Sequence, residues 1–180
     1  NKICIETMMQ DILMFIIPAI ITAIAVSRRP GDFLMITKSP GVVNTLLVFL
    51  IMIVSVPAMN VIIELNESLK LPESMSAIQQ WMIDSEKSAA ETMKLILGSG
   101  SIASLIVGLL LVGVMAGFSE ELFFRGTLQQ IIHSTPVNKH VAIWVTAIIF
   151  SAIHLQFFGF IPRMLLGAFF GYLAVWQGSL

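Results

Sequence analysis

The feature that most constrains this chain is a series of long apolar runs, each close to the length that crosses a lipid bilayer. A membrane-spanning helix needs about 20 predominantly apolar residues. Five runs approach that length: Met8–Val26, Gly41–Ile63, Gly98–Phe118, Val141–Phe160 and Ile161–Trp176. The sequence therefore predicts an all-α integral membrane protein, a polytopic helix bundle with at least five transmembrane helices.

The composition excludes several other classes of protein. Of 180 residues, 57% are hydrophobic and 12% charged, and the mean hydropathy is +0.91. A soluble domain carries about 25% charged residues, and a core of this size cannot hide so much apolar surface. A net charge of -1 without any Lys/Arg cluster argues against nucleic acid as a partner. The lone Cys4 excludes an internal disulfide framework and a thiolate metal cluster.

One extended polar stretch, Glu64–Leu97, separates the second run from the third. Apolar residues recur in it at spacings of three, four or seven, which indicates an amphipathic helix on the membrane surface or against the bundle. These residues are Met75, Ile78, Met82, Ala89, Met93 and Ile96. The helix is interpreted either as a packing element or as a lid over a substrate site.

Loop charges predict the orientation, because Lys and Arg accumulate on the cytoplasmic side. Residues 27–40 contain Arg28, Arg29 and Lys38, and residues 133–140 contain Lys139. We therefore expect these two connections in the cytoplasm and residues 64–97 outside.

Small residues recur in the later runs with a spacing that lets helix backbones approach closely. The two pairs are Gly113-x-x-x-Gly117 and Gly167-x-x-x-Gly171. They predict tight helix packing around a core site, either within one bundle or between two, so the oligomeric state stays open.

Charges follow the third run directly, in the segment SEELFFR, residues 119–125. An ionisable group within a membrane span is costly and marks a functional site by default. Glu121 and Arg125 lie four apart in the favourable acid-before-base order, so a helix allows them to pair. Glu120 is rotated by roughly 100° from Glu121. This pattern indicates one glutamate held by an arginine and another free for proton transfer.

His154 is the second candidate, and a depth calculation connects it with Glu120. If the third helix continues through SEELFFR to Ile132, Glu120 lies thirteen residues before His133, and His154 lies fourteen after His140. At 1.5 Å rise per residue, both lie about 20 Å from the shared turn. An antiparallel helix pair therefore brings the glutamate and the histidine to similar depth.

A glutamate and a histidine that face each other in a low-dielectric bundle can bind and polarise a water molecule. Such a pair suits hydrolysis of an amide bond. The alternative is a charge network that only fixes the register of the helices.

These residues carry a family resemblance. Glu120-Glu121-x-x-x-Arg125 followed by Phe150-x-x-x-His154 resembles the membrane-embedded CPBP family. That family includes type II CAAX prenyl endopeptidases and bacteriocin-processing or self-immunity proteins. The resemblance covers residues 98–180, interpreted as a catalytic core. Residues 1–97 match only as a variable N-terminal part with two transmembrane helices and a polar amphipathic segment.

The resemblance implies a glutamate-dependent intramembrane endopeptidase that cuts near the C-terminus of a membrane-associated peptide, either prenylated or leader-bearing. Glu120 would activate water together with His154, and Glu121 and Arg125 would support the site. The implied mechanism uses no cofactor; zinc is not favoured, because the sequence has no His-Glu-x-x-His motif and no obvious three-ligand set. The implied location is the bacterial cytoplasmic membrane.

One family motif, His-x-x-x-Asn/Asp on a later helix, is not found before Leu180. The expectation is a core truncated at that end. Two other functions remain as alternatives. The first is a non-catalytic membrane interaction protein, such as an immunity or transporter-regulating factor. The second, an ion or proton pathway, is less favoured because the runs show no inverted repeat of broken helices.

Overall fold

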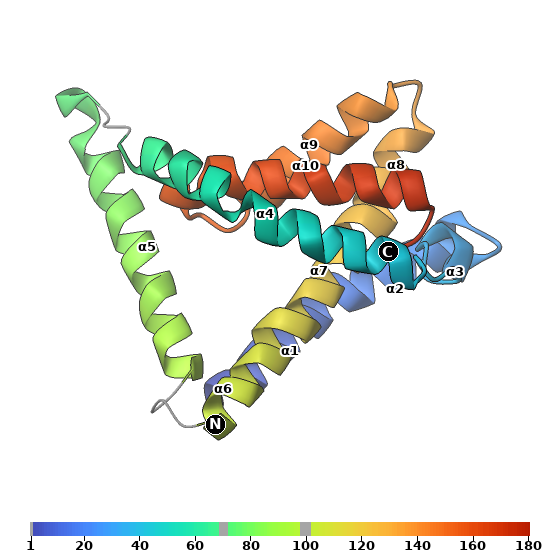
Figure 1. The fold of residues 1–180 in the computed structure, drawn as a ribbon, viewed down its shortest axis with the longest axis horizontal. Coiled ribbons are helices and arrows are strands. Elements are labelled where there is room, and N and C mark those ends of the chain that lie inside the picture. The colour runs from blue at the N-terminus through green and yellow to red at the C-terminus, as the bar shows by residue number, and fades with distance from the viewer. Residues whose placement is uncertain (1, 69–71, 98–101) are drawn as a thin grey trace.

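The computed structural model describes residues 2–68, 72–97 and 102–180, and every regular element among them is helical (Figure 1). The elements are α1 (Lys2–Asp11), η1 (Ile12–Ile16), α2 (Ile17–Val26), α3 (Pro30–Phe33), α4 (Val42–Glu67), η2 (Glu73–Met75), α5 (Ser76–Leu97), α6 (Ile102–Gly108), η3 (Leu109–Ala116), α7 (Gly117–Phe123), η4 (Phe124–Leu128), α8 (Gln129–Ser134), α9 (Lys139–Ala152), η5 (Phe157–Gly159) and α10 (Phe160–Gln177). The predicted all-α class is confirmed.

Four helices are long and apolar enough to cross a membrane: Cys4–Val26, Val42–Glu67, Leu105–Ser134 and Phe157–Gln177. The chain is thus an integral membrane protein. Several short elements join end to end within these helices, because single π-helical stretches such as η1, η3 and η4 interrupt the α-helical hydrogen bonding without ending the helix.

The third span confirms the prediction that the helix runs on through SEELFFR. It is continuous from Leu105 to Ser134, so Glu120 lies at its middle. The predicted start of this span, residues 98–101, lies outside the described residues.

The prediction of at least five transmembrane helices is not confirmed. The expected fourth span, Val141–Phe160, is instead the 14-residue helix α9, which ends at Ala152. Pro162 explains the division of the apolar run. A proline lacks the backbone N–H that a continuous helix needs, but it is tolerated in a first turn. It stands in the first turn of α10, and a turn therefore separates α9 from α10.

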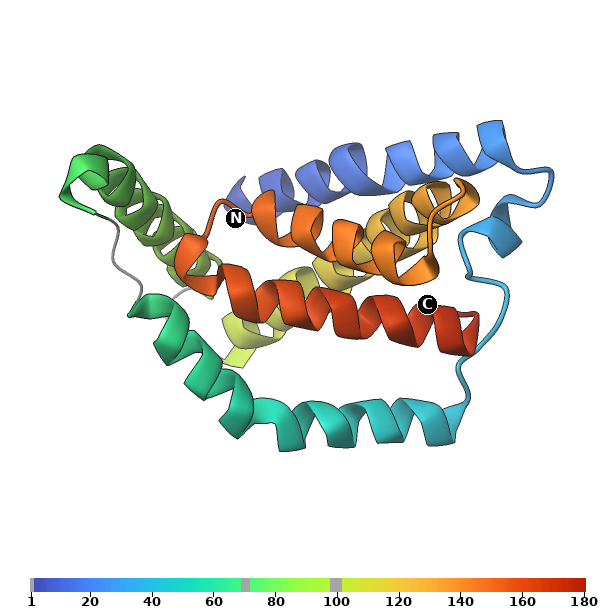
Figure 2. The same cartoon turned by 90° about the horizontal axis from the view of Figure 1, so that it is seen from above.

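The first span lies alongside the third. α1 contacts η3, and η1 contacts α7. Figure 2 shows α1 and α2 on the side of the bundle opposite to α4. Ala19 and Ala23 are fully buried where α2 approaches Leu34 and Leu122. Small side chains at this contact let the two helices approach closely.

The predicted amphipathic helix within Glu64–Leu97 is present as α5, which is 22 residues long. It touches the bundle near both ends, where the ring of Trp81 packs at a tilt against that of Phe157, at 5.2 Å between centroids, and Ile96 is buried near α6. Figure 1 shows α5 running apart from the other helices between these two contacts. Residues 69–71 of the same stretch lie outside the described residues.

The two glycine pairs behave differently. A methyl group on Gly171 would stand 2.7 Å from Oε1 of Gln129, and one on Gly167 would stand 3.3 Å from Cα of Ala147, so both glycines permit close helix packing. A methyl group on Gly117 would meet nothing within 4 Å, and one on Gly113 would meet only Leu109 of its own helix. The packing prediction is confirmed for the second pair. For the first pair it is not confirmed among the residues that the structure describes, and packing between two bundles stays a prediction.

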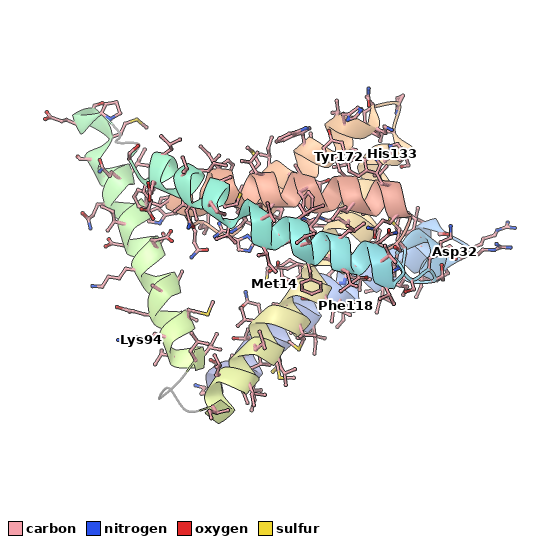
Figure 3. The ribbon with its side chains drawn as sticks, viewed as in Figure 1. Met14, Asp32, Lys94, Phe118, His133 and Tyr172 are labelled. Carbon is pink, nitrogen blue, oxygen red and sulfur yellow. The ribbon has the colours of Figure 1, made fainter. Side chains whose placement is uncertain are left out.

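The connections predicted to share one side of the membrane lie at one end of the molecule. Asp32, in the first connection, and His133, next to the third, are both far from Lys94 on α5 (Figure 3). The C-terminus reaches the same end, since the backbone N–H of Leu180 donates to the carbonyl oxygen of Met35 at 3.0 Å. Which end faces the cytoplasm stays a prediction.

Candidate active site

Glu121 and Arg125 form the ion pair that their spacing predicts. The Nη1 atom of Arg125 lies 2.9 Å from Oε1 of Glu121. The π-helical stretch η4 begins between them, yet the two side chains still share a face of the third span. The arginine side chain is 1% exposed and that of the glutamate is 31% exposed. The ion pair therefore joins a buried cation to a partly accessible carboxylate.

Arg125 is the largest fully buried side chain among the described residues. Its Nη2 donates to the carbonyl oxygen of Gly167 at 3.1 Å, and its Cζ lies 4.7 Å from the centre of the Phe150 ring. A desolvated guanidinium gains from such contacts through charge-assisted hydrogen bonding and cation–π attraction. Arg125 therefore ties the third span to both α9 and α10.

Glu120 and His154 are also brought together. The Nε2 atom of His154 lies 3.7 Å from Oε1 of Glu120, and each side chain is about one quarter exposed, at 25% and 24%. This separation is too long for a direct hydrogen bond but suits a bridge through one water molecule. The depth calculation is confirmed by this contact.

The other ring nitrogen of His154 fixes the tautomer. Nδ1 lies 2.7 Å from the backbone oxygen of Phe150. A carbonyl oxygen only accepts hydrogen bonds, so Nδ1 carries a proton and donates it there. In the neutral ring, Nε2 then has a free lone pair directed towards Glu120.

Phe150 connects the two pairs. Its ring packs edge-on against the imidazole of His154 at 5.0 Å between centroids, while Arg125 lies over it. The aromatic ring thus fixes the positions of the imidazole and the guanidinium at the same time.

His154 does not lie inside a helix, contrary to the prediction. It stands in the turn that follows α9, and Leu155 beside it adopts a left-handed conformation with φ of 54°. Ser151 closes this turn by donating to the carbonyl oxygen of Phe160 at 2.7 Å. His154 thus reaches Glu120 from the turn after α9, at the depth that its distance from the shared turn predicts, although α9 is shorter than a full span.

Asn66, near the end of α4, holds the far part of the same turn. Its Nδ2 donates to the carbonyl oxygens of Phe157, at 2.9 Å, and Phe158, and its Oδ1 accepts from the backbone N–H of Ile161 at 3.4 Å. Asn66 is 4% exposed, and it is the buried residue of α4. It links α4 to the segment that carries His154.

A cavity of about 430 Å³ lies at these residues. Its lining includes Glu120, Glu121, Phe150, His154 and Arg163, from α7, α9, the turn after α9, and α10. A second cavity of about 410 Å³, bordered by α4 and α10, is mainly apolar and also reaches Glu121. Both volumes fall within the range of roughly 300–1,000 Å³ that small-molecule sites occupy.

Three polar residues at or near the site were not assigned from the sequence. Arg163 is a charged residue inside the last apolar run. A charged residue at membrane depth indicates a functional site, so the sequence does contain a signal for it. Asp11 is 6% exposed, with Oδ2 lacking a hydrogen-bond partner. Asn66 is neutral and stands among apolar residues, and its role follows only from the tertiary contacts.

The remaining histidines lie elsewhere. His133 and His140 are exposed near the turn between α8 and α9, and Nδ1 of His140 lies 2.8 Å from the hydroxyl of Tyr172. Within residues 2–68, 72–97 and 102–180, no group of three or more His, Cys, Asp or Glu side chains converges in the manner of a metal site.

Comparison with known proteins agrees with the motifs. Residues 102–180 match the family described as type II CAAX prenyl endopeptidase Rce1-like. No curated protein and no solved structure gives a significant match to the chain. The matched region spans α6 to α10 and contains both motif segments, with Glu120, Glu121, Arg125 and His154. Residues 102–180 are thus similar to the Rce1-like family of type II CAAX prenyl endopeptidases.

Proposed function

We propose that this protein is an intramembrane endopeptidase that hydrolyses a peptide bond near the C-terminus of a membrane-associated or lipidated peptide, in a bacterial cytoplasmic membrane. The observation that carries the proposal is the 3.7 Å contact between Nε2 of His154 and Oε1 of Glu120 at the wall of a membrane-embedded cavity. The family match of residues 102–180 supports the same class of reaction.

In the proposed mechanism, one water molecule lies between the two side chains. It donates one hydrogen bond to Glu120 and the other to Nε2 of His154, whose Nδ1 proton is held by the Phe150 carbonyl. As the water oxygen attacks the scissile carbonyl carbon, its proton passes to the carboxylate of Glu120. The same proton then passes to the amide nitrogen, and the C–N bond breaks. General base catalysis of this kind contributes about 10²–10⁴-fold in rate.

Glu121 and Arg125 act as a brace in this mechanism. Their ion pair of 2.9 Å, together with the bond from Arg125 to Gly167, fixes the third span against α10. Glu120 is the next residue along the helix, so this brace also sets the direction of its carboxylate. The proposed division of roles is therefore proton transfer by Glu120 and positioning by Glu121 and Arg125.

The mainly apolar cavity between α4 and α10 supports a lipid-bearing substrate. Its lining includes Val48, Met52, Phe170 and Leu173, and it meets the site cavity at Glu121 and Phe170. An apolar chain in this cavity would place its attached peptide beside Glu120.

Proteolysis by the purified protein in liposomes tests the proposal, with Glu120→Ala and His154→Ala compared with the wild type. Both variants are expected to lose peptidase activity by at least about 100-fold while melting at the wild-type temperature. His133→Ala is the matched control, since His133 is exposed and away from the cavity. Undiminished cleavage by either site variant would overturn the proposal.

A further inference from the structure

Arg163 is a charged residue inside the last membrane span, Phe157–Gln177. It stands in the first turn of α10 and is partly buried. Ionisable side chains at membrane depth are costly, and they face a cavity or a partner. The mechanism described above does not use this residue, so its position calls for a separate explanation.

The contacts of Arg163 are with neutral groups. Its Nη2 donates to Oε1 of Gln156 at 2.5 Å, and its Nη1 donates to the backbone oxygen of Gln156 at 3.4 Å. Within the described residues, its guanidinium forms no ion pair with a carboxylate. A guanidinium has five N–H donors. Arg163 therefore keeps both a positive charge and hydrogen-bonding capacity for an incoming group.

The cavity that Arg163 lines is the one that contains Glu120 and His154. Gln156, which holds the guanidinium, lies two residues beyond His154 in the same turn. Arg163 and the proposed catalytic pair thus border one space of about 430 Å³, and the charges of Glu86 and Glu120 act on the guanidinium without forming an ion pair with it among the described residues.

Because Gly159 has no side chain, the guanidinium of Arg163 can lie against it. A methyl group built on this glycine would stand 3.2 Å from Nη2 of Arg163 and 3.7 Å from its Cζ. The position of the guanidinium is therefore set from two sides, by Gln156 and by the bare backbone of Gly159.

An anion is the group that this arrangement favours. The N-terminal end of a helix carries partial positive charge, and cations are stabilised at the other end. Arg163 in the first turn of α10 adds to that positive potential instead of opposing it. A carboxylate matches the planar guanidinium with two parallel hydrogen bonds, which gives affinity and direction.

We propose that Arg163 is a specificity-determining residue that binds the C-terminal carboxylate of the substrate inside the cavity. The identity of the anion rests on the proposed peptidase function. Held in this way, the end of the peptide fixes which bond lies beside Glu120 and His154. A substrate with a free carboxylate is then preferred over the same peptide ending in an amide.

A structural role for Arg163 is the competing explanation. Glu86 on α5 and Glu67 on α4 line an adjoining cavity of about 320 Å³ together with Arg163, and Oε2 of Glu86 has no hydrogen-bond partner. A rotation of the arginine towards Glu86 would form an ion pair between α5 and α10. In that case, Glu86→Gln and Arg163→Gln would have the same effect, and neither would depend on the end group of the peptide.

The experiment measures binding of two fluorescent apolar peptides, identical except for a C-terminal carboxylate or carboxamide, to the full protein in uncharged detergent. All proteins carry Glu120→Gln, so no cleavage disturbs the measurement. We expect the parent to bind the carboxylate at least about 10-fold more tightly, the size of one hydrogen bond to a charged group. Arg163→Gln should abolish this ratio, and Arg163→Lys and Gly159→Ala should reduce it. Glu86→Gln should preserve it.

Equal binding of the two peptides by the parent, or a ratio that survives in Arg163→Gln, would overturn the proposal. If Arg163→Gln and Glu86→Gln weakened the binding of both peptides equally, the proposal would also be overturned, and Arg163 would have a structural role. A carboxylate preference without any cleavage by the protein with Glu120 restored would leave the anion site standing and would refute only the peptidase function.

Discussion

The α7–α10 region and helix α4 distribute their polar and apolar side chains in different ways. In the first, the fully buried side chains include the polar Arg125, Gln129, Thr146 and Ser151 together with the apolar Phe124 and Ile143. In α4, large apolar side chains such as Val54, at 68% exposed, point outward, and the buried residue is Asn66. Lipid solvates apolar groups well, so the stability of this protein depends on the contacts, polar and apolar, that are buried between the helices of the first region. The comparison predicts where substitutions will be costly.

The largest effect on stability is expected from Arg125→Met. The substitution removes the bond to Gly167 and leaves Glu121 without its counter-ion, and breaking a buried ion pair by removing one partner costs about 3–5 kcal/mol. Arg28→Met, at an exposed position, is the control. Chemical unfolding in mixed micelles gives the free energy of unfolding of both variants. An unchanged value for Arg125→Met would contradict the role of the buried polar contacts in stability.

Gly171→Ala is expected to cost about 1–3 kcal/mol, the usual penalty for overpacking. Its new methyl group would stand 2.7 Å from Gln129 Oε1 and 2.9 Å from Ile143 Cγ2, both on buried side chains. Gly117→Ala should leave the melting temperature unchanged, since its methyl group meets no atom within 4 Å. Equal melting temperatures for the two variants would contradict this account of the close packing.

Asn66→Ala should cost about 1–3 kcal/mol, because it leaves partly buried backbone groups between α9 and α10 without their partner. Its effect should reach the active site as well, since that turn carries His154. Ser68→Ala, on an exposed side chain at the end of α4, is the control. Thermal unfolding gives the stability change, and an Asn66→Ala protein as stable as the control would show that α4 is not held by this contact.

The smallest effect is expected on the exposed face of α4. Val54→Ala should change stability by less than about 0.5 kcal/mol, as for other exposed sites. Ile143→Ala, at a residue 1% exposed, should cost about 2–5 kcal/mol because it opens a cavity. The difference between these two variants measures burial directly, and a larger loss at Val54 would mean that another surface covers α4.

Much of this arrangement is predictable from the sequence because charges in lipid are costly and helical spacing is regular. The pairing of Glu121 with Arg125 follows from a separation of four residues, and the approach of His154 to Glu120 follows from equal distances to one turn. Both contacts follow from the spacing of residues along a helix. They can therefore be predicted without any knowledge of how the helices pack.

The remaining features depend on how separate helices meet. Hydropathy alone makes Val141–Trp176 a nearly continuous apolar stretch, and the early end of α9 follows from Pro162 together with the distant Asn66. Gly113 and Gly117 meet no other helix within the described residues, because the same spacing serves packing only where another helix lies opposite. Packing of this pair between two bundles stays a prediction. The position of Arg163 beside Gln156 likewise requires the turn to be known.

The central claim is that Glu120 and His154 act as one catalytic unit, and a double-mutant cycle on peptidase activity tests it most directly. The measurement compares the kcat of the wild type, Glu120→Gln, His154→Gln and the double variant on one membrane-associated peptide. Residues that act on the same water are strongly non-additive. The account predicts that the double variant loses no more activity than the more impaired single variant. Losses that multiply across the cycle, or a single variant with wild-type kcat, would contradict it.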